Sequence, residues 1–75
     1  MATYNGHKCW AYWNVSFWFN NDEGLYRLCQ CKIRFYGKGG AAKPIQDFLF
    51  ASGRTCTPDG ARYSLSAIRA ALASF

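Results

Sequence analysis

The sequence is poor in the residues that metal sites, acid–base catalysis and membrane spans require. Its 75 residues include one histidine, two prolines and only four acidic side chains. The longest stretch without a charge lies between Lys8 and Asp22, contains three asparagines and a serine, and is too short to cross a hydrocarbon layer of about 30 Å. We therefore expect no transmembrane helix.

The first residues do not follow the pattern of a secretory signal. Met1 is followed by the polar residues Thr3, Asn5, His7 and Lys8, whereas a signal has a basic start followed by an apolar region. On this basis we expect the protein to stay in the cytoplasm where it is made.

The expected cytoplasmic location determines how we interpret the four cysteines, Cys9, Cys29, Cys31 and Cys56. Thiols in a reducing compartment stay reduced unless they bind metal or catalyse, so we expect no disulfides. Zinc accepts thiolate and imidazole together, and His7 could join the set, but both local pairs are separated by one residue instead of about two to four. We interpret the cysteines as small buried hydrophobes and predict no metal and no cofactor.

Catalytic groups are equally sparse. His7 has no acidic neighbour in sequence, and a helix start explains Asp22 and Glu23 without acid–base chemistry. The glycine-rich segment around Lys38 matches neither a phosphate-binding loop nor a dinucleotide-binding motif. A chain this short also has little room for a pocket on the order of a few hundred Å³. We predict that it is not an enzyme.

Apolar and aromatic residues, by contrast, are abundant, at 51% and 19% of the chain. A chain of this length supports one core, so we predict a single compact domain over residues 1–75. Five tryptophan and phenylalanine rings fall within ten residues: Trp10, Trp13, Phe17, Trp18 and Phe19. Because each such ring buries roughly 150–250 Å², we predict that these five anchor the core.

The segment from Lys8 to Asn20 has two competing patterns, one alternating as in a strand and one with helical spacing. We favour a helix, because a second helix starts immediately afterwards with no hairpin turn between. Asn21 is predicted to cap that second helix, with Asp22 and Glu23 in its first turn. Its apolar stripe comprises Leu25, Leu28, Cys29, Ile33 and Tyr36, and Gly37 is predicted to end it.

Two further helices are predicted towards the C-terminal end. The first has Pro44 in its first turn, a stripe formed by Ala41, Ile45, Phe48 and Leu49, and an end at Ser52 and Gly53. The segment Thr55 to Tyr63 contains a turn at Thr57–Gly60 and fits a short hairpin or an extended loop equally well. Ser64 then caps a helix with Leu65, Ile68, Leu72 and Phe75 facing inward. The predicted fold is mainly α, a small bundle of three to four helices.

The net charge of +5 favours an acidic partner, either nucleic acid or an acidic protein surface. The middle of the chain is purely basic, and a solvated face explains that pattern as well as a binding patch does. The candidate contact residues are Arg27, Lys32, Arg34, Lys38, Lys43, Arg62 and Arg69.

The run from Trp13 to Trp18, followed by Asn21, Asp22, Glu23, Gly24, Leu25 and Tyr26, resembles a motif of small uncharacterised proteins of phages and mobile elements. The resemblance implies a setting, because small phage proteins often inhibit host defence by occluding a surface, as anti-CRISPR proteins do. We interpret the motif mainly as structural. The alternative is that Trp13, Trp18 or Tyr26 lies exposed beside Arg27 as an aromatic hot spot.

A second resemblance covers Ile45 to Leu72, which is similar to a segment of large serine recombinases that links two helices near a DNA-binding region. It implies DNA contact by Arg54, Arg62, Ser64, Ser66 and Arg69. The catalytic domain is missing, so recombination is not implied. The connection is also too long for a helix-turn-helix, whose turn has about three to four residues.

Three hypotheses follow from the sequence. The first is a phage accessory protein of anti-CRISPR type that binds and inhibits a host defence nucleoprotein complex, acting in the host cytoplasm by occluding an acidic or nucleic-acid-binding surface. The second is a small DNA-binding protein that uses its last helix. The third is a homo-oligomeric structural protein, with a homodimer as its simplest form.

Overall fold

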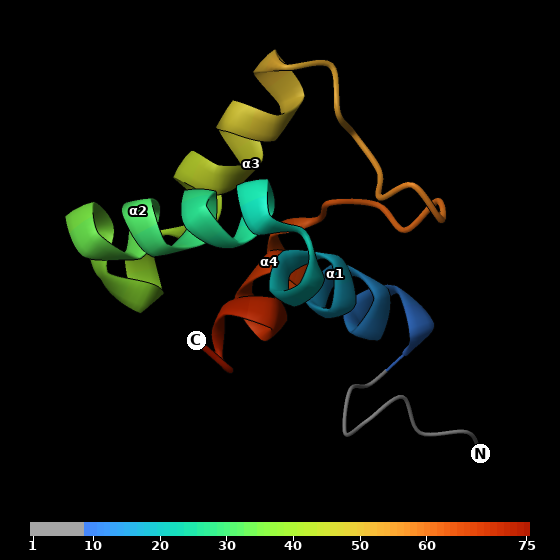
Figure 1. The fold of residues 1–75 in the computed structure, drawn as a ribbon, viewed down its shortest axis with the longest axis horizontal. Coiled ribbons are helices and arrows are strands. Elements are labelled where there is room, and N and C mark those ends of the chain that lie inside the picture. The colour runs from blue at the N-terminus through green and yellow to red at the C-terminus, as the bar shows by residue number, and fades with distance from the viewer. Residues whose placement is uncertain (1–8) are drawn as a thin grey trace.

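The computed structural model describes residues 9–75, which form four helices. They are α1 (Trp10–Asn21), α2 (Glu23–Gly40), α3 (Ala42–Ala51) and α4 (Leu65–Leu72). Helix α4 packs against each of the other three, while α2 and α3 form a bent pair beside it (Figure 1). The predicted small helical bundle is confirmed, and so is the helical form of the first segment. Within residues 9–75, no helix combines the length and apolarity that a membrane span needs.

The core is formed mainly by aliphatic residues, with one ring from α1. All four helices contribute buried side chains: Val15, Phe19, Leu25, Cys29, Ile45, Leu49, Ile68 and Leu72. Phe19 stacks on Tyr63, with ring centroids 5.9 Å apart. Buried alanines on α3 and α4 let the helix backbones approach closely around these larger groups.

The prediction that five rings of α1 anchor the core is wrong for Trp10, Trp13 and Phe17, whereas Trp18 packs against the core at its edge. Trp10 and Phe17 are 39% and 42% exposed, Trp13 and Trp18 are half-buried, and only Phe19 is fully enclosed. A helix can turn only one stripe inward, and α1 turns the stripe that contains Val15 and Phe19. The prediction of inward stripes is also wrong for Tyr36 and Phe48, which are more than half exposed.

The junction between α1 and α2 is one residue later than predicted. Asn21 is still helical and donates a hydrogen bond from Nδ2 to the Phe17 carbonyl at 2.7 Å. Asp22 adopts an extended backbone, and its Oδ1 accepts from the Leu25 amide at 3.0 Å. The N-cap is therefore Asp22 and not Asn21, while Glu23 lies in the first turn as predicted. Ser64 caps α4 as predicted, accepting from the Ala67 amide at 3.2 Å.

Gly37 bends α2 at the point where the sequence predicts its end. Its φ of 73° and ψ of 166° interrupt the helical backbone, and one further turn leads through Gly40 and Ala41 into α3. This combination of dihedral angles is almost restricted to glycine. The bend allows α3 to fold back against α2.

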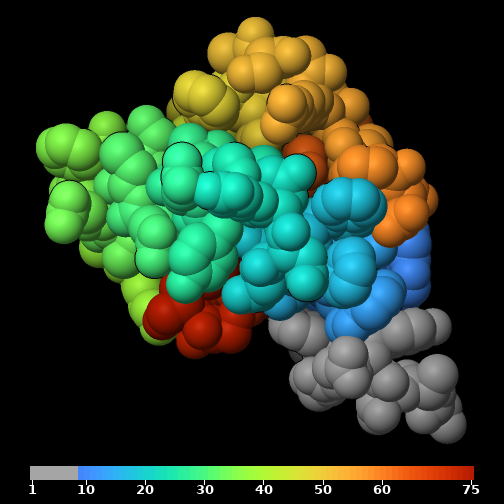
Figure 2. Space-filling model, viewed as in Figure 1, coloured from blue at the N-terminus to red at the C-terminus, as the bar shows by residue number. Residues whose placement is uncertain are grey.

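The segment Thr55 to Tyr63 forms a hairpin-shaped loop with a single antiparallel bridge, between Cys56 and Arg62. Its turn closes with a hydrogen bond from the Gly60 amide to the Thr57 carbonyl at 2.8 Å. In Figure 2 this loop, in orange, covers one side of α1, in blue.

Side-chain hydrogen bonds hold that loop against α1. Thr57 donates from Oγ1 to Oδ1 of the buried Asn14 at 2.5 Å. Asn14 Nδ2 and Trp18 Nε1 each donate to Asp59 Oδ2 at 2.9 Å. Every buried side-chain nitrogen or oxygen among residues 9–75 has a hydrogen-bond partner. The polar residues of the tryptophan-rich run therefore have a structural role.

Stability should depend on the ionisation of Asp59. The hydrogen bond from Asn14, and then that from Trp18, lower the pKa of this carboxyl below its ordinary value of 3.8. Because the folded pKa lies below the unfolded one, the stabilisation is present at neutral pH and is lost as the pH falls below about 4 through the folded pKa. The stability gap between the native protein and Asp59→Asn, measured by urea unfolding, should be largest at pH 7 and shrink towards pH 2. A gap that does not change with pH would contradict this.

Replacing Gly37 should destabilise the bend. A Cβ added at Gly37 or at Gly39 would meet nothing within 4 Å, so only the backbone distinguishes the two positions. We expect Gly37→Ala to lower the free energy of unfolding by on the order of 1–3 kcal/mol. Gly39→Ala, at a position without positive φ, should leave it unchanged or raise it by up to about 1 kcal/mol. Equal effects of the two substitutions in urea denaturation would refute the role assigned to the bend.

Candidate binding surface

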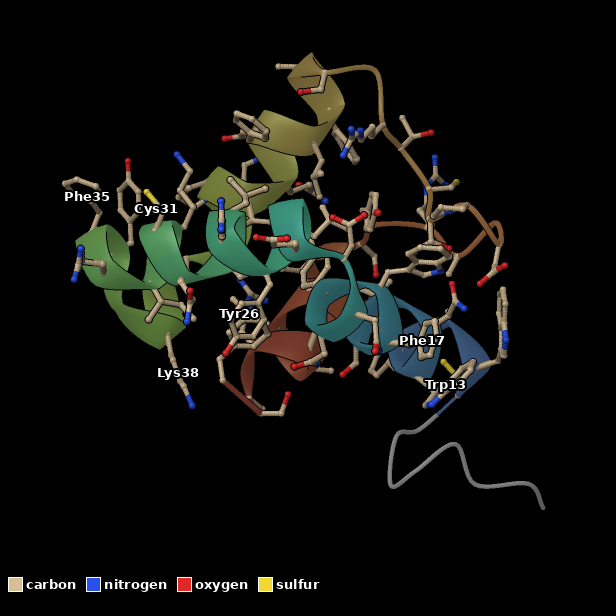
Figure 3. All side chains as sticks on the ribbon, in the orientation of Figure 1. Trp13, Phe17, Tyr26, Cys31, Phe35 and Lys38 are labelled. Atoms are coloured by element: carbon tan, nitrogen blue, oxygen red, sulfur yellow. The ribbon has the colours of Figure 1, made fainter. Side chains whose placement is uncertain are left out.

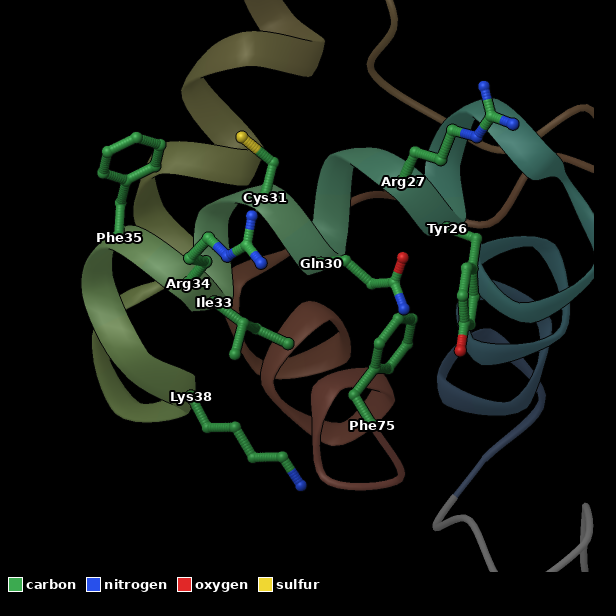
Figure 4. A pocket seen from close by; sticks show the side chains of 9 residues that line it. All are labelled: Tyr26, Arg27, Gln30, Cys31, Ile33, Arg34, Phe35, Lys38 and Phe75. Atoms are coloured by element: carbon green, nitrogen blue, oxygen red, sulfur yellow. The ribbon is translucent and has the colours of Figure 1, made fainter.

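A groove with a volume of about 770 Å³ lies between α2 and the residues that follow α4 (Figure 4). We call it the α2 groove. Its lining consists of Tyr26, Arg27, Gln30, Cys31, Ile33, Arg34, Phe35, Lys38 and Phe75. Eight of these nine residues come from α2, because α2 turns Leu25 and Cys29 into the core and presents its opposite side outward.

The apolar part of the α2 groove is built around two stacked rings. The Tyr26 and Phe75 rings have centroids 5.1 Å apart and an interplanar angle of 29°. Phe75 reaches this place because the chain turns back after α4, with the Phe75 amide donating to the Leu72 carbonyl at 3.0 Å. Figure 4 shows Tyr26, Ile33 and Lys38 on the side of α2 that faces Phe75, whereas Cys31 and Phe35 point to its other side.

Three cations, Arg27, Arg34 and Lys38, surround this apolar surface. Arg27 pairs with Glu23 at 2.5 Å, but both side chains are 75% exposed, so water competes effectively with that pair. Arg34 and Lys38 form no ion pair with any carboxylate of residues 9–75. Lys38 donates from Nζ to the Ala73 carbonyl at 3.4 Å. The groove thus combines an apolar centre with positive charge that the described part of the chain leaves largely uncompensated.

The other four predicted contact residues lie elsewhere. Lys32 sits over the Phe48 ring, with Nζ 6.0 Å from its centroid, and Lys43 pairs with Asp47 at 3.1 Å. Arg62 belongs to the hairpin-shaped loop, and Arg69 lies on the exposed side of α4. Of the seven predicted contact residues, the structure therefore brings only Arg27, Arg34 and Lys38 together.

A second, smaller hollow of about 340 Å³ lies at the α1–α2 junction and is lined by Trp18, Asp22, Leu25, Arg54, Cys56, Pro58 and Tyr63. The expectation that so short a chain has little room for a pocket is therefore wrong. The space arises because the long loop between α3 and α4 crosses the junction without filling it.

The cysteines are predicted correctly only in part. Cys29 is buried, and burial raises the pKa of its thiol to about 12, so it stays protonated. Cys9, Cys31 and Cys56 are exposed, which contradicts their interpretation as buried hydrophobes. Among residues 9–75 no three His, Cys, Asp or Glu side chains gather as metal ligands would. His7, the remaining candidate ligand, lies outside the described residues.

Of the three aromatic residues that the sequence offered as an exposed group beside Arg27, Tyr26 has that position. Its side chain is 38% exposed and shares the α2 groove with Arg27. Figure 3 shows Trp13 and Phe17 at the opposite end of the molecule from Phe35 and Cys31. Those two rings of α1 pack on each other, with centroids 5.4 Å apart, and they take no part in the groove.

The sequence did not predict Gln30, Cys31 and Phe35 as groove residues. Ile33 and Phe75 pack against the core as predicted, and they also line the groove, which was not predicted. The sequence contained a signal for part of the groove, because Arg27, Cys31 and Arg34 follow one another at intervals of four and three residues, which is the spacing of one helix face. Lys38 follows the break at Gly37 and is not placed by that spacing. Nothing in the sequence indicated that Phe75 would line the groove, because its position depends on how the chain turns after α4.

No curated protein and no solved structure shows significant similarity to the chain. A family match is found and covers residues 1–72, almost the whole sequence. The chain therefore belongs to this family, which is described as a family of unknown function (DUF7249).

Proposed function

We propose that this chain is a non-enzymatic binding protein that docks through the α2 groove onto an acidic surface of a larger complex. The proposal depends on one observation, the convergence of Arg27, Arg34 and Lys38 around the exposed apolar surface of Tyr26 and Phe75. Cations of this kind accelerate the encounter with an acidic partner, and aromatic groups that lose their water on contact supply much of the affinity.

The resemblance to small proteins of phages and mobile elements supplies the setting for this binding. We extend the proposal accordingly to a phage accessory protein of anti-CRISPR type, which acts in the host cytoplasm. Its mode of action is occlusion: the bound chain covers an acidic or nucleic-acid-binding surface of a host defence nucleoprotein complex. The net charge of +5 supports an acidic partner.

The DNA-binding alternative has less support. The one cation on α4 is Arg69, and its exposed neighbours Ser66 and Ala73 carry no charge. Arg54 lines the second hollow, at a distance along the chain from α4. Proteins that hold duplex DNA at moderate salt make roughly six to ten phosphate contacts, which a helix with one cation cannot supply by itself.

A homo-oligomeric structural protein is also less well supported. Each copy carries a charge of +5, so association between copies brings like charges together. The exposed rings of α1 could pack between copies, but the cations on the outer side of α2 favour a partner of opposite charge.

Two double variants with the same change in net charge test the proposal. Arg34→Glu with Lys38→Glu reverses the two groove cations, and Arg62→Glu with Arg69→Glu reverses the two cations of the DNA-binding alternative. Immobilised native protein should capture a partner from host-cell lysate, the second variant should capture it equally, and the first should lose at least about 90% of it. Quantitative mass spectrometry of the eluates measures the difference.

Duplex DNA binding, measured by fluorescence anisotropy at about 50 and 200 mM salt, completes the test. Tight duplex binding with a steep salt dependence, abolished by Arg62→Glu with Arg69→Glu and accompanied by no captured protein, would contradict the proposal. Circular dichroism of both variants confirms that the helices are retained.

A further inference from the structure

The geometry points to a specific kind of occupant for the α2 groove, namely an amphipathic helix of the partner with an apolar stripe flanked by carboxylates. This inference rests on the proposed function and narrows it from an acidic surface to an acidic helix. The groove needs an elongated occupant because its lining follows α2 from Tyr26 to Lys38. The unbroken part of α2 within that lining, from Tyr26 to Phe35, extends roughly 14 Å at a rise of about 1.5 Å per residue, or about two and a half helical turns.

The spacing of the groove residues matches helix-on-helix packing. Arg27, Cys31 and Arg34, which precede the break at Gly37, recur at intervals of four and three residues. This is the 3.5-residue average that keeps one face of a helix against a neighbouring helix. The small Cys31 side chain lies between two long ones, so a knob from the partner can enter at its position. Helices that lie in apolar grooves use anchors at the same intervals.

The chemistry of the groove defines the two faces of the occupant. Tyr26, Ile33 and Phe75 offer apolar surface on the side that faces α4, and Phe35, which is 76% exposed, offers it on the other side. Arg34 lies between these two apolar regions (Figure 4). An occupant therefore needs an apolar stripe that covers Tyr26, Ile33 and Phe75, with carboxylates along its edges that reach the surrounding cations. An amphipathic helix provides that arrangement.

The positive charge of the α2 groove favours an acidic partner helix over a second copy of this chain as its occupant. The outward residues of α1 include no charged group between Trp10 and Asn21, and the exposed acids of α2 and α3, Glu23 and Asp47, already pair with Arg27 and Lys43. No helix of residues 9–75 thus offers unpaired carboxylates beside an apolar stripe.

Single-stranded nucleic acid fits the α2 groove less well than an acidic helix does. Proteins that bind single strands follow the phosphate backbone with a continuous positive groove, whereas Glu23 pairs with Arg27 at one end of the α2 groove.

A set of synthetic peptides tests the inference with purified protein. The reference is a stapled 16-residue helix with leucines at heptad spacing flanked by glutamates. Three matched peptides replace the leucines with serine, the glutamates with glutamine, or two central residues with proline in place of the staple. We expect the reference to bind at least about tenfold more tightly than each of the three by fluorescence anisotropy in 150 mM salt, where long-range attraction is screened.

The double variants locate the binding. Arg34→Glu with Lys38→Glu should weaken the reference peptide at least about tenfold, whereas Arg62→Glu with Arg69→Glu should weaken it less than about threefold. Amide NMR shift changes should follow Tyr26 to Lys38 and Phe75. Equal binding of reference and glutamine peptides, equal loss in both variants, or tighter binding of a 16-nucleotide thymidine strand than of the reference would overturn the inference. If no peptide binds while partner capture still depends on Arg34 and Lys38, the helix is wrong and the proposed function stands.

Discussion

The buried side-chain amide of Asn14 is the interaction on which the arrangement of this chain depends. A buried amide destabilises a core unless its hydrogen bonds are satisfied, and the partners of Asn14 are Thr57 and Asp59, more than forty residues away. These bonds place the long loop between α3 and α4 against α1. The loop in turn positions Tyr63, whose ring stacks on Phe19, and leads directly into the cap of α4.

This constraint determines which surfaces are available for recognition. Trp18 donates to Asp59 and is held by the loop, and the remaining rings of α1 pack partly on one another. Arg27 and Arg34 on the outward side of α2 have no comparable structural role, because Leu25 and Cys29 on its inner side supply the packing. Cations and apolar groups can therefore accumulate there at little cost to the fold. Because α1 and the loop supply the buried hydrogen bonds and the outer side of α2 is left for other contacts, a chain of 75 residues can have both a stable core and a groove lined by cations.

The sequence predicted the elements better than their packing. Short-range signals depend on neighbouring residues, so the bend at Gly37, the turn at Thr57–Gly60 and the cap at Ser64 could all be recognised. The inward face of α1 could not be predicted, because rings occur on several sides of that helix and only its tertiary contacts, chiefly with α4, decide between them. The cap at Asp22 was missed by one residue because Asn21 is an equally good capping residue, and tertiary packing extends α1 through it.

The residues of the α2 groove could also be predicted only in part, because tertiary contacts bring some of them together. The structure brings three of the seven candidate cations together. The spacing along α2 could have identified Arg27 and Arg34 but not Lys38, which follows the break at Gly37. Phe75 could not be assigned, since its contact with Tyr26 joins positions 49 residues apart and depends on the turn after α4. Lys32 and Lys43 resembled the groove cations in sequence, but their neighbours on α3, Phe48 and Asp47, engage them.

The central claim, that recognition takes place on the outward side of α2, can be tested with the native cysteines. Cys31 lines the α2 groove, whereas Cys9 and Cys56 are exposed outside it. The measurement is the rate of N-ethylmaleimide alkylation at each cysteine, followed by mass spectrometry, for the free chain and for the chain bound to its captured partner. We expect binding to slow alkylation of Cys31 at least about tenfold and to leave Cys9 and Cys56 unchanged. Protection of Cys9 or Cys56 with Cys31 still reactive would contradict the claim.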